Sequence, residues 1–598
     1  MRKMSDTKER LFKGGAFLIE DLRGEDIVTP EDFTDEHLMI AKTTEEFVMN
    51  EVVPNMEQLE NQQFDLTVKL MKKAGELGLL GADVQEEYGG LELDKISSAL
   101  ISEKFSRSGG GFSITHGGHV GIGSLPIVFF GNEEQKKKYL PKLASGELLS
   151  AYALTEAGSG SDALAAKTTA VLNEEGTHYI LNGEKQFITN AAFADLFIVY
   201  AKIDGEHFSA FIVERDFPGV STGPEEKKMG IKSSSTRPLI LNDVKVPVEN
   251  LLGEKGKGHK IAFNILNVGR YKLAVGAVGA AKRALELAAA YVNERKQFQL
   301  PLSAFSLTKE KLATMATAIY ANESAVYRTT GLLEQRLGSL DEEQLNDGQQ
   351  AAKSIAEYQI ECSMNKVTAT EMLDYVIDEA VQLHGGNGFI QEYEVERIYR
   401  DSRINRIFEG TNEINRLLIP GVLLKKAMKG ELPLLQEAEK LQEEILMLMP
   451  EEPGTEALEQ EKYLLKNAKK IVLFAAAAAV QKYMQKIEKE QEILANLANM
   501  AAEVYNMESA ILRTEKAMEN GGEAKHQQKL LYTQVYVQEA FQRIEQEAKE
   551  VIIAVETGDS LRMMLSSLRK LTRHTPINVI AKKREIAETI IEKEKYTV

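Results

Sequence analysis

One change of residue pattern constrains this chain most: a single β-rich block, residues 149–255, lies between long helical stretches. Runs such as 196–200 and 208–213 are rich in β-branched and aromatic residues and are separated by Gly, Asp and Asn turns. On either side of the block, apolar residues recur at helical spacing, as they do over 66–77. The sequence therefore predicts a mainly α protein with a central β-domain.

The same pattern predicts how the chain divides into parts. The expected parts are an N-terminal arm at 1–35, a helical domain at 36–148, the β-domain at 149–255, a second helical domain at 256–424 and an appended helical domain at 425–598. Alanine-rich segments at 268–294, 307–337 and 354–383 favour close helix packing in the second helical domain, which we expect to end near Pro420. The appended region is richer in Glu and Lys.

Composition excludes several classes of protein. The net charge of −18 argues against nucleic-acid binding, which requires clustered Lys and Arg. Cys362 is the only cysteine, so no disulfide can form within the chain. His116 and His119 are the only closely spaced histidines; we expect them to line a wall or cap a turn, and we expect no metal site. Residues 1–13 are charged and lack the apolar segment of a signal peptide, which predicts a cytoplasmic protein.

The most hydrophobic run, residues 471–480, has two interpretations. It is about half as long as the ~20 residues that cross a bilayer, so no transmembrane helix is expected. Lys466, Lys469 and Lys470 precede it, and basic residues beside an apolar helix can lie on an anionic membrane surface. The run has no polar face, however, which favours burial in a helix bundle over membrane contact.

Glu409 is the first candidate for chemistry. It follows Ile407 and Phe408, and a carboxylate buried among apolar residues has a raised pKa and is a better general base. The following Gly410 and Thr411 also suit a turn before a helix, in which case Glu409 is an ordinary residue near a helix start. Local composition leaves both interpretations open.

Resemblance to a known family favours the catalytic interpretation. The segment 408–414, preceded by 382–389, resembles the C-terminal signature of the acyl-CoA dehydrogenases. The resemblance implies that Glu409 removes the α-proton of an acyl-CoA while hydride leaves for FAD. The product would be trans-2-enoyl-CoA, as in fatty acid β-oxidation. It also implies the helical–β–helical fold of that family over about 36–420, and the appended region resembles the very-long-chain branch.

Two motifs in the β-rich block resemble the flavin signatures of the family. In the first, residues 151–162, the resemblance places Leu154 and Thr155 at the isoalloxazine and Ser161 at flavin or substrate. The resemblance also implies that Tyr152, in the strand of this motif, contacts the cofactor. In the second, Asn182-Gly183 is a hairpin signal and the following strand, 184–190, carries cofactor residues. These are Phe187, Ile188 and Thr189, with Phe187 in place of the family's usual Trp.

Substrate and interface residues follow in the second helical domain. Asn267 and Arg270 lie on one face of a helix, where a solvated salt bridge is the alternative role. The resemblance implies that they contact the CoA part of the substrate, and that Gly410 also contacts substrate. Some relatives place the base at the position of Gly269, where glycine cannot act as one. The resemblance also implies that a further set reaches the FAD of a neighbouring subunit: Arg295, Gln297, Phe298, Gln382, Gly385, Gly386, Thr411 and Glu413.

The resemblance also implies partners and a substrate preference. We expect a homo-oligomer, with a dimer favoured, and an electron-transferring flavoprotein as electron acceptor. Gly117 and Gly118 fall where the family forms the floor of the acyl pocket, and the missing side chains favour long-chain acyl-CoA. The alternatives are an acyl-CoA oxidase that uses dioxygen and a non-enzymatic binding or assembly protein of the same fold. Glu409, Arg270 and both flavin motifs weigh against the second.

Overall fold

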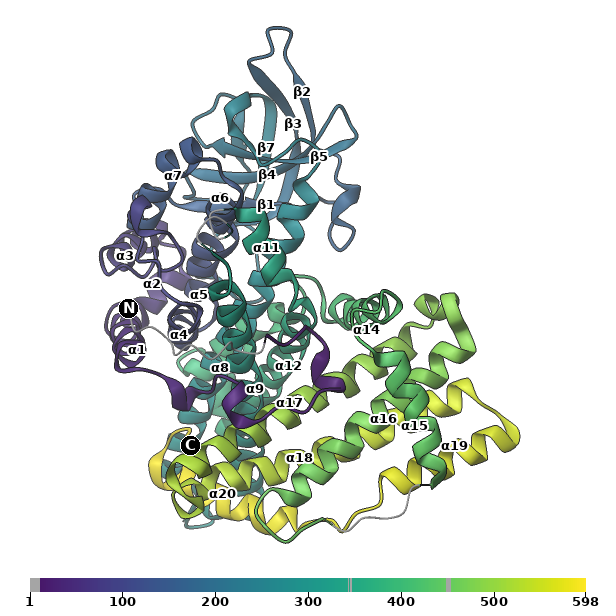
Figure 1. The fold of residues 1–598 in the computed structure, drawn as a ribbon. Helices are drawn as coiled ribbons and strands as arrows, with labels where there is room; N and C mark the ends of the chain where they lie inside the picture. Colours follow the sequence, from purple (N-terminus) through teal and green to yellow (C-terminus); the bar gives the residue numbers. More distant parts are fainter. Residues whose placement is uncertain (1–10, 342–343, 345–346, 448–452) are drawn as a thin grey trace.

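The computed structural model describes residues 11–598 except 342–343, 345–346 and 448–452. Residues 1–10, which are ten of the thirteen residues on which the cytoplasmic prediction rests, lie outside the described part. The β-domain lies at one end of the molecule, long helices form the centre, and the appended helices lie beside them at the other end (Figure 1).

The N-terminal helices pack around two hydrophobic clusters. They are α1 (Asp35–Phe47), α2 (Met56–Glu60), α3 (Phe64–Glu76), α4 (Lys95–Phe105), α5 (Gly110–Gly117), α6 (Leu125–Phe130) and α7 (Glu133–Ser145). Asn132 caps α7, and Gly146 ends it in the left-handed conformation that suits glycine. A π-helical turn, η8 (Gly118–Gly123), continues α5, and such turns often occur at functional sites.

The β-domain is an eight-stranded sheet with the order β6-β7-β3-β2-β4-β5-β8, and β1 pairs in parallel with β4. Its strands are β1 (Ser150–Ala153), β2 (Thr169–Leu172), β3 (His178–Thr189), β4 (Leu196–Ile203), β5 (His207–Glu214), β6 (Val220–Thr222), β7 (Thr236–Pro247) and β8 (Leu251–Leu252). The hairpin predicted at Asn182-Gly183 is wrong. Strand β3 runs through both residues with a register shift against β7, where Gly183 has a φ of 155°.

The second helical domain is built on α8 (Gly258–Glu294), α9 (Ser306–Gly338) and α12 (Gln359–His384). Shorter helices complete it: α11 (Gly348–Ala356), α13 (Glu394–Ser402) and α14 (Asn412–Met428), with a small hairpin of β9 (Lys296–Gln297) and β10 (Leu300–Pro301). The last helix of this domain, α14, continues through Pro420, near which the domain was expected to end, to Met428. The segment 354–383 is divided between α11 and α12.

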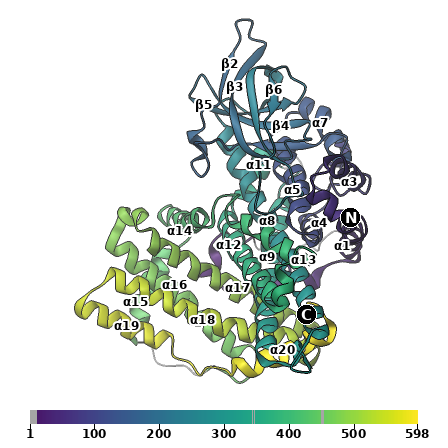
Figure 2. The same cartoon turned by 180° about the vertical axis from the view of Figure 1, so that it is seen from behind.

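The appended region is a helical bundle that packs on α9 and α14 (Figures 1 and 2). It comprises α15 (Leu434–Met447), α16 (Glu459–Tyr483), α17 (Gln491–Gly521), α18 (Gln527–Val555), α19 (Gly558–Leu571) and α20 (Val579–Lys593). The apolar run 471–480 lies in α16 and contributes to the bundle core, as predicted. Lys469 and Lys470 form ion pairs with Glu508 and Glu444. No helix in the described part of the chain is long and apolar enough to cross a membrane.

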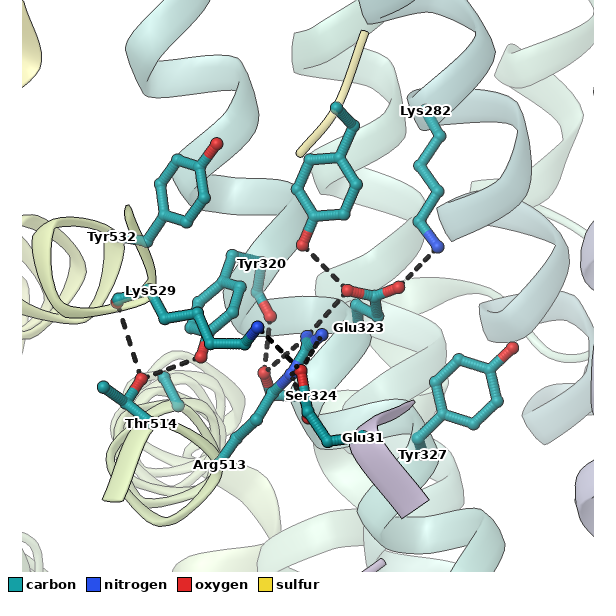
Figure 3. Close-up of polar contacts among 12 residues, drawn as sticks. Glu31, Lys282, Tyr320, Glu323, Ser324, Tyr327, Arg513, Thr514, Lys529 and Tyr532 are labelled. Carbon is teal, nitrogen blue, oxygen red and sulfur yellow. Dashed lines mark hydrogen bonds and ion pairs between the residues drawn. The ribbon is translucent and has the colours of Figure 1, made fainter. Parts of the chain in front are cut away.

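A buried ionic network joins the appended region to the second helical domain and the N-terminal arm (Figure 3). Glu323 of α9 pairs with Lys282 of α8 and accepts a hydrogen bond of 2.7 Å from Arg513 of α17. Arg513 also pairs with Glu31 of the N-terminal arm at 2.9 Å. From the C-terminal end, Tyr596 donates to Glu323 at 2.8 Å. Both ends of the chain therefore contribute to this contact.

Candidate active site

A cavity of about 1000 Å³ opens between the β-domain, helices α5 and α8, and the loop before α14. Fourteen of the residues singled out from the sequence line it: Gly117, Gly118, Tyr152, Leu154, Thr155, Ser161, Phe187, Ile188, Thr189, Asn267, Arg270, Glu409, Gly410 and Thr411. Seven others do not: Arg295, Gln297, Phe298, Gln382, Gly385, Gly386 and Glu413. The fold thus brings together residues from five segments of the sequence: 117–118, 152–161, 187–189, 267–270 and 409–411.

Glu409 lies at the wall of this cavity in an unusual backbone conformation. Its φ is 56° and that of Gly410 is 78°, so two successive residues adopt the left-handed region, which is costly for a non-glycine residue. Its carboxylate packs against α8, where a Cβ on Gly269 would lie 2.5 Å from Oε2. Glycine at 269 therefore makes room for the carboxylate, and any side chain there would displace it.

The Glu409 carboxylate is buried without a close ionic partner. Its Oε2 atom has no hydrogen-bond partner. Burial raises its pKa to about 7, although Arg270 and Lys366 act to lower it. A carboxylate with a pKa near neutrality can take up and release a proton under working conditions, which is what a general base requires.

Arg270 contacts the backbone beside this carboxylate. Its Nε donates to the carbonyl oxygen of Glu409 at 3.2 Å, and Nη1 donates to Asn267 Oδ1 at 3.0 Å. The side chain is buried, which lowers its pKa against the attraction of Glu409. The solvated salt bridge considered for Arg270 is therefore not what the structure contains.

Lys366 of α12 is a site residue that the sequence analysis missed. Its Nζ donates to the carbonyl oxygen of Gly410 at 2.8 Å and to Asn412 Oδ1 at 2.7 Å. Burial lowers its pKa to about 7, against the attraction of Glu409. The available signal was a lysine on the apolar face of α12, where an unpaired charge would be costly.

Glu156 is a second missed residue, and it fixes the loop after β1. It accepts hydrogen bonds from Lys167 N at 2.6 Å, Thr168 N at 3.1 Å and Lys185 Nζ at 2.7 Å. Burial acts to raise its pKa, but these bonds outweigh burial and lower the pKa to about 2. Lys185 also donates to the carbonyl oxygen of Leu154 at 3.2 Å, so the ion pair positions the loop that carries Thr155.

Phe187 and Tyr152 contribute aromatic side chains to the lining of the cavity. Phe187 lies at a register shift in β3 with a φ of 60°, and its side chain is 55% exposed. Tyr152 is packed edge-to-face on Tyr200, with ring centroids 5.2 Å apart, and its hydroxyl has no partner. An exposed ring and an unpartnered buried hydroxyl in the lining of one cavity suit a flat ligand with polar edges.

The glycine-rich end of α5 forms another wall of the cavity. A Cβ added to Gly117 or Gly121 would meet no atom within 4 Å, whereas one on Gly118 would lie 3.3 Å from Thr189 and Asn190. The space predicted from Gly117 and Gly118 is therefore provided chiefly by Gly117, together with Gly121, which the sequence analysis did not single out. His116 and His119 are buried beside this wall, and each bonds a backbone carbonyl. No cluster that could hold a metal occurs among the described residues.

Six of the seven predicted residues outside the cavity lie at another corner of the molecule, near the ends of α8 and α12; the seventh, Glu413, is in the first turn of α14, close to the cavity-lining Thr411. The β9–β10 hairpin that carries Gln297 and Phe298 follows α8, and Tyr291 near the end of α8 stacks on His384 at 4.1 Å. His384 directly precedes Gly385 and Gly386. Phe298 is 88% exposed, so this corner leaves apolar surface uncovered on the isolated chain.

Known proteins similar to this chain are acyl-CoA dehydrogenases. Models of the acyl-CoA dehydrogenase N-terminal, middle and C-terminal domains match residues 34–147, 151–244 and 256–424. A further C-terminal domain model of the same family matches 467–570. The chain is 69% identical over 586 residues to a probable acyl-CoA dehydrogenase of Bacillus subtilis, covering 98% of each protein. It is 41% identical over 353 residues to the human very long-chain specific enzyme, covering 58% of this chain and 51% of that one.

Solved structures agree with these matches. An acyl-CoA dehydrogenase from Bacillus anthracis, complexed with FAD, superimposes with a TM-score of 0.97 at 69% identity, covering 98% of this chain and 100% of that one. Butyryl-CoA dehydrogenase from Megasphaera elsdenii gives 0.60 at 36% identity, covering 66% of this chain and 99% of that one.

Proposed function

The chain belongs to the acyl-CoA dehydrogenase family, and within it we propose that this FAD-dependent oxidoreductase oxidises long-chain acyl-CoA to trans-2-enoyl-CoA in fatty acid β-oxidation, with Glu409 as the base. The observation that carries the proposal is the Glu409 carboxylate, buried at the cavity wall, unpartnered at Oε2 and with a pKa raised to about 7.

The residues at the cavity edge fit an FAD isoalloxazine. The exposed Phe187 ring offers a stacking surface, and Leu154, Thr155, Ser161 and Thr189 offer backbone and hydroxyl groups around it. When bound, FAD supplies the hydride acceptor for the reaction. Arg295, Gln297, Phe298, Gln382, Gly385, Gly386, Thr411 and Glu413 are proposed to hold the remainder of the cofactor bound to a neighbouring subunit.

The chain's own contribution is to bind the thioester and move one proton. Asn267 and Arg270 contact the CoA part, and the acyl tail runs along the glycine-rich wall of α5. Glu409 then takes the proton from Cα onto its carboxylate. The backbone N–H of Glu409 donates to the thioester oxygen and stabilises the negative charge that develops there.

The test of this role is Glu409→Gln, which is nearly isosteric but cannot accept the proton. We expect the purified variant to keep its yellow cofactor and to lose flavin reduction by palmitoyl-CoA in anaerobic stopped-flow measurements. Glu361→Gln is the matched control, because burial also raises the pKa of Glu361 to about 7 but this residue lies outside the cavity. Substantial reduction by Glu409→Gln would remove Glu409 from the role.

The electron acceptor distinguishes this proposal from an acyl-CoA oxidase. We propose an electron-transferring flavoprotein as the partner. After reduction by substrate, the enzyme should reoxidise slowly in air and rapidly with that flavoprotein. Rapid reoxidation by dioxygen with stoichiometric hydrogen peroxide would favour the oxidase instead.

The open wall at Gly117 supports the preference for long chains. Each buried methylene contributes about 0.8 kcal/mol, so a deeper channel favours longer tails strongly. We expect kcat/KM to rise from octanoyl-CoA to palmitoyl-CoA, and Gly117→Leu to reverse that order by filling the channel. A parent enzyme that prefers eight carbons or fewer would contradict the proposal.

A homodimer with FAD at its interface completes the proposal. The exposed Phe298 beside Arg295 supports an interface at this corner. Arg295→Ala should weaken cofactor binding and dimerisation together, because a ligand bound across an interface stabilises it by linkage. The appended domain is proposed to cover the surface that shorter tetrameric relatives use, so sedimentation should give a dimer; a stable tetramer would count against it.

A further inference from the structure

The backbone around Glu409 is held by two buried cations from different helices. Arg270 of α8 donates to the carbonyl oxygen of Glu409, and Lys366 of α12 donates to that of Gly410. Glu409 and Gly410 have φ values of 56° and 78°. Two successive left-handed residues of this kind persist only where the surrounding structure fixes them. Lys366 therefore contacts the strained turn that aims the carboxylate.

Lys366 also fixes the residue that begins α14. Its second bond, 2.7 Å, is to the side chain of Asn412, whose Nδ2 donates to Glu371 at 3.0 Å. Arg416 in turn binds Glu371 through two bonds of 2.7 Å. The turn and the start of the helix are thus anchored to α12 by one ammonium group, and Lys366 itself has no exposed surface.

Neither cation neutralises the carboxylate directly. Both donate to backbone carbonyl groups, while Glu409 Oε2 has no hydrogen-bond partner. A close ion pair would hold the Glu409 pKa far below neutrality and make the carboxylate a weak base. A positive charge one residue away instead favours the ionised form moderately, and it leaves the oxygen atom available to substrate.

We propose that Lys366 is a positioning residue for the Glu409 base: its ammonium group fixes the 409–412 backbone and supplies positive charge that favours the ionised carboxylate. The inference rests on the proposed function of Glu409. Charged or titratable groups facing the pair come from every surrounding element: Arg270 from α8, Glu371 from α12, Tyr152 from β1 and Glu413 from α14.

The proton step can be measured apart from oxidation. An acyl-CoA with sulfur in place of the β-carbon, 3-thiahexadecanoyl-CoA, has no β-hydrogen to transfer, so only exchange of its α-hydrogens remains. Exchange into D2O is followed by mass spectrometry with full-length, FAD-loaded enzyme over pH 5.5–9, in the parent and in Lys366→Met. Flavin absorbance and the melting temperature show whether each variant is folded.

We expect Lys366→Met to move the pH midpoint of exchange upward and to reduce the rate at pH 6 on the order of tenfold, since removing positive charge raises the Glu409 pKa. Lys366→Arg should return the midpoint toward that of the parent. Lys469→Met is the matched control, because Lys469 is also buried, pairs with a glutamate and donates to a backbone carbonyl, but in the appended domain. Its pH profile should be that of the parent.

An unchanged profile in folded Lys366→Met overturns the inference. If that variant does not fold, Asn412→Ala decides, since it removes one of the two acceptors of Lys366 and leaves the charge in place. Reduced exchange in Asn412→Ala supports the positioning role, and parental exchange overturns it. Persistent exchange in Glu409→Gln would instead refute the proposed base, so the two failures are distinguishable.

Discussion

Two buried glutamates in this protein have the same chemistry and opposite surroundings. Glu323 lies where the appended domain meets the second helical domain. It pairs with Lys282 and accepts hydrogen bonds from Arg513 and Tyr596 (Figure 3). Glu409, at the cavity, has no bond to Oε2. Burial acts to raise the pKa of both, but Lys282 and Arg513 hold the pKa of Glu323 well below its usual range, whereas that of Glu409 rises to about 7.

The difference is the one expected between a carboxylate with a structural role and the base proposed here. A fully paired buried carboxylate stays ionised and holds elements together, and removing one of its partners leaves a charge uncompensated. A buried carboxylate without close partners is poised to exchange a proton, at a cost in stability. Burial alone does not distinguish the two; the partners do.

Arg513→Met should have the largest effect on stability, because it removes the buried ion pairs of Arg513 with Glu323 and Glu31. It leaves Glu323 and Glu31 without their shared cation, and breaking a buried pair in this way costs about 3–5 kcal/mol. We expect a clear fall in the urea midpoint of the FAD-loaded enzyme.

Arg543→Met provides the control for that prediction. Arg543 pairs with Glu503 between α17 and α18, but its side chain is about half exposed, and exposed pairs contribute only about 0–1 kcal/mol. Equal losses of stability in the two variants would show that the Glu323 network is not a special contact.

The pH dependence of stability should differ in sign between the two glutamates. The pKa of Glu409 is raised on folding, so its contribution to stability is complete below its ordinary pKa of 4.5 and is lost as pH rises toward about 7. The difference corresponds to at most roughly 3 kcal/mol. The pKa of Glu323 is lowered, so its contribution is present above about pH 4.5 and is lost in acid.

Urea unfolding of the cofactor-free protein between pH 5 and pH 8 measures the first effect. In the parent, the contribution of Glu409 to the free energy of unfolding should decline from pH 5 to pH 8. In Glu409→Gln it should be absent, because the amide does not titrate. A decline of the same size in the variant would assign it to other groups.

Much of this could be predicted from the sequence, and the reasons are local. The β-rich block predicts the central domain, and the FAD-dependent family and fold class are confirmed. The family motifs led to Glu409 and both flavin segments, which line one cavity; their roles stay predictions. The hairpin predicted at Asn182-Gly183 is wrong, because pairing of β3 with β2 and β7 overrides the local preference of these two residues for a turn. The second helical domain was expected to end near Pro420, but its last helix, α14, tolerates Pro420 and continues to Met428.

The remaining features depend on contacts between distant segments, which no local pattern encodes. Lys366 lies 43 positions before Glu409 but bonds the next carbonyl, that of Gly410. The Glu323 network joins the arm at Glu31 to Arg513, and neither residue stands out in its own segment. Gly269 allows the Glu409 carboxylate to fit only because α8 crosses the turn at that point.

The smallest expected effect is on stability, and it comes from adding one methyl group at either of two glycines: Gly331, at the contact between α9 and the arm, and Gly117, at the cavity. Gly331 of α9 packs against Val28 of the arm, where an added Cβ would lie 2.5 Å from two side-chain atoms, and overpacking of this kind costs about 1–3 kcal/mol. Gly117 has a helical φ of −62°, and an added Cβ there meets no atom within 4 Å. Helix propensity alone should then make Gly117→Ala more stable by up to ~1 kcal/mol.

Thermal melts of Gly117→Ala and Gly331→Ala in the same buffer measure this difference. We expect the melting temperature to rise slightly for Gly117→Ala and to fall for Gly331→Ala, since the first adds a methyl group to an open cavity and the second to a closed contact. Gly117→Ala should also reduce kcat/KM for palmitoyl-CoA more than for octanoyl-CoA, because the methyl group narrows the channel that only the longer tail reaches. A destabilised Gly117→Ala would mean that this wall is packed against the protein and not reserved for substrate.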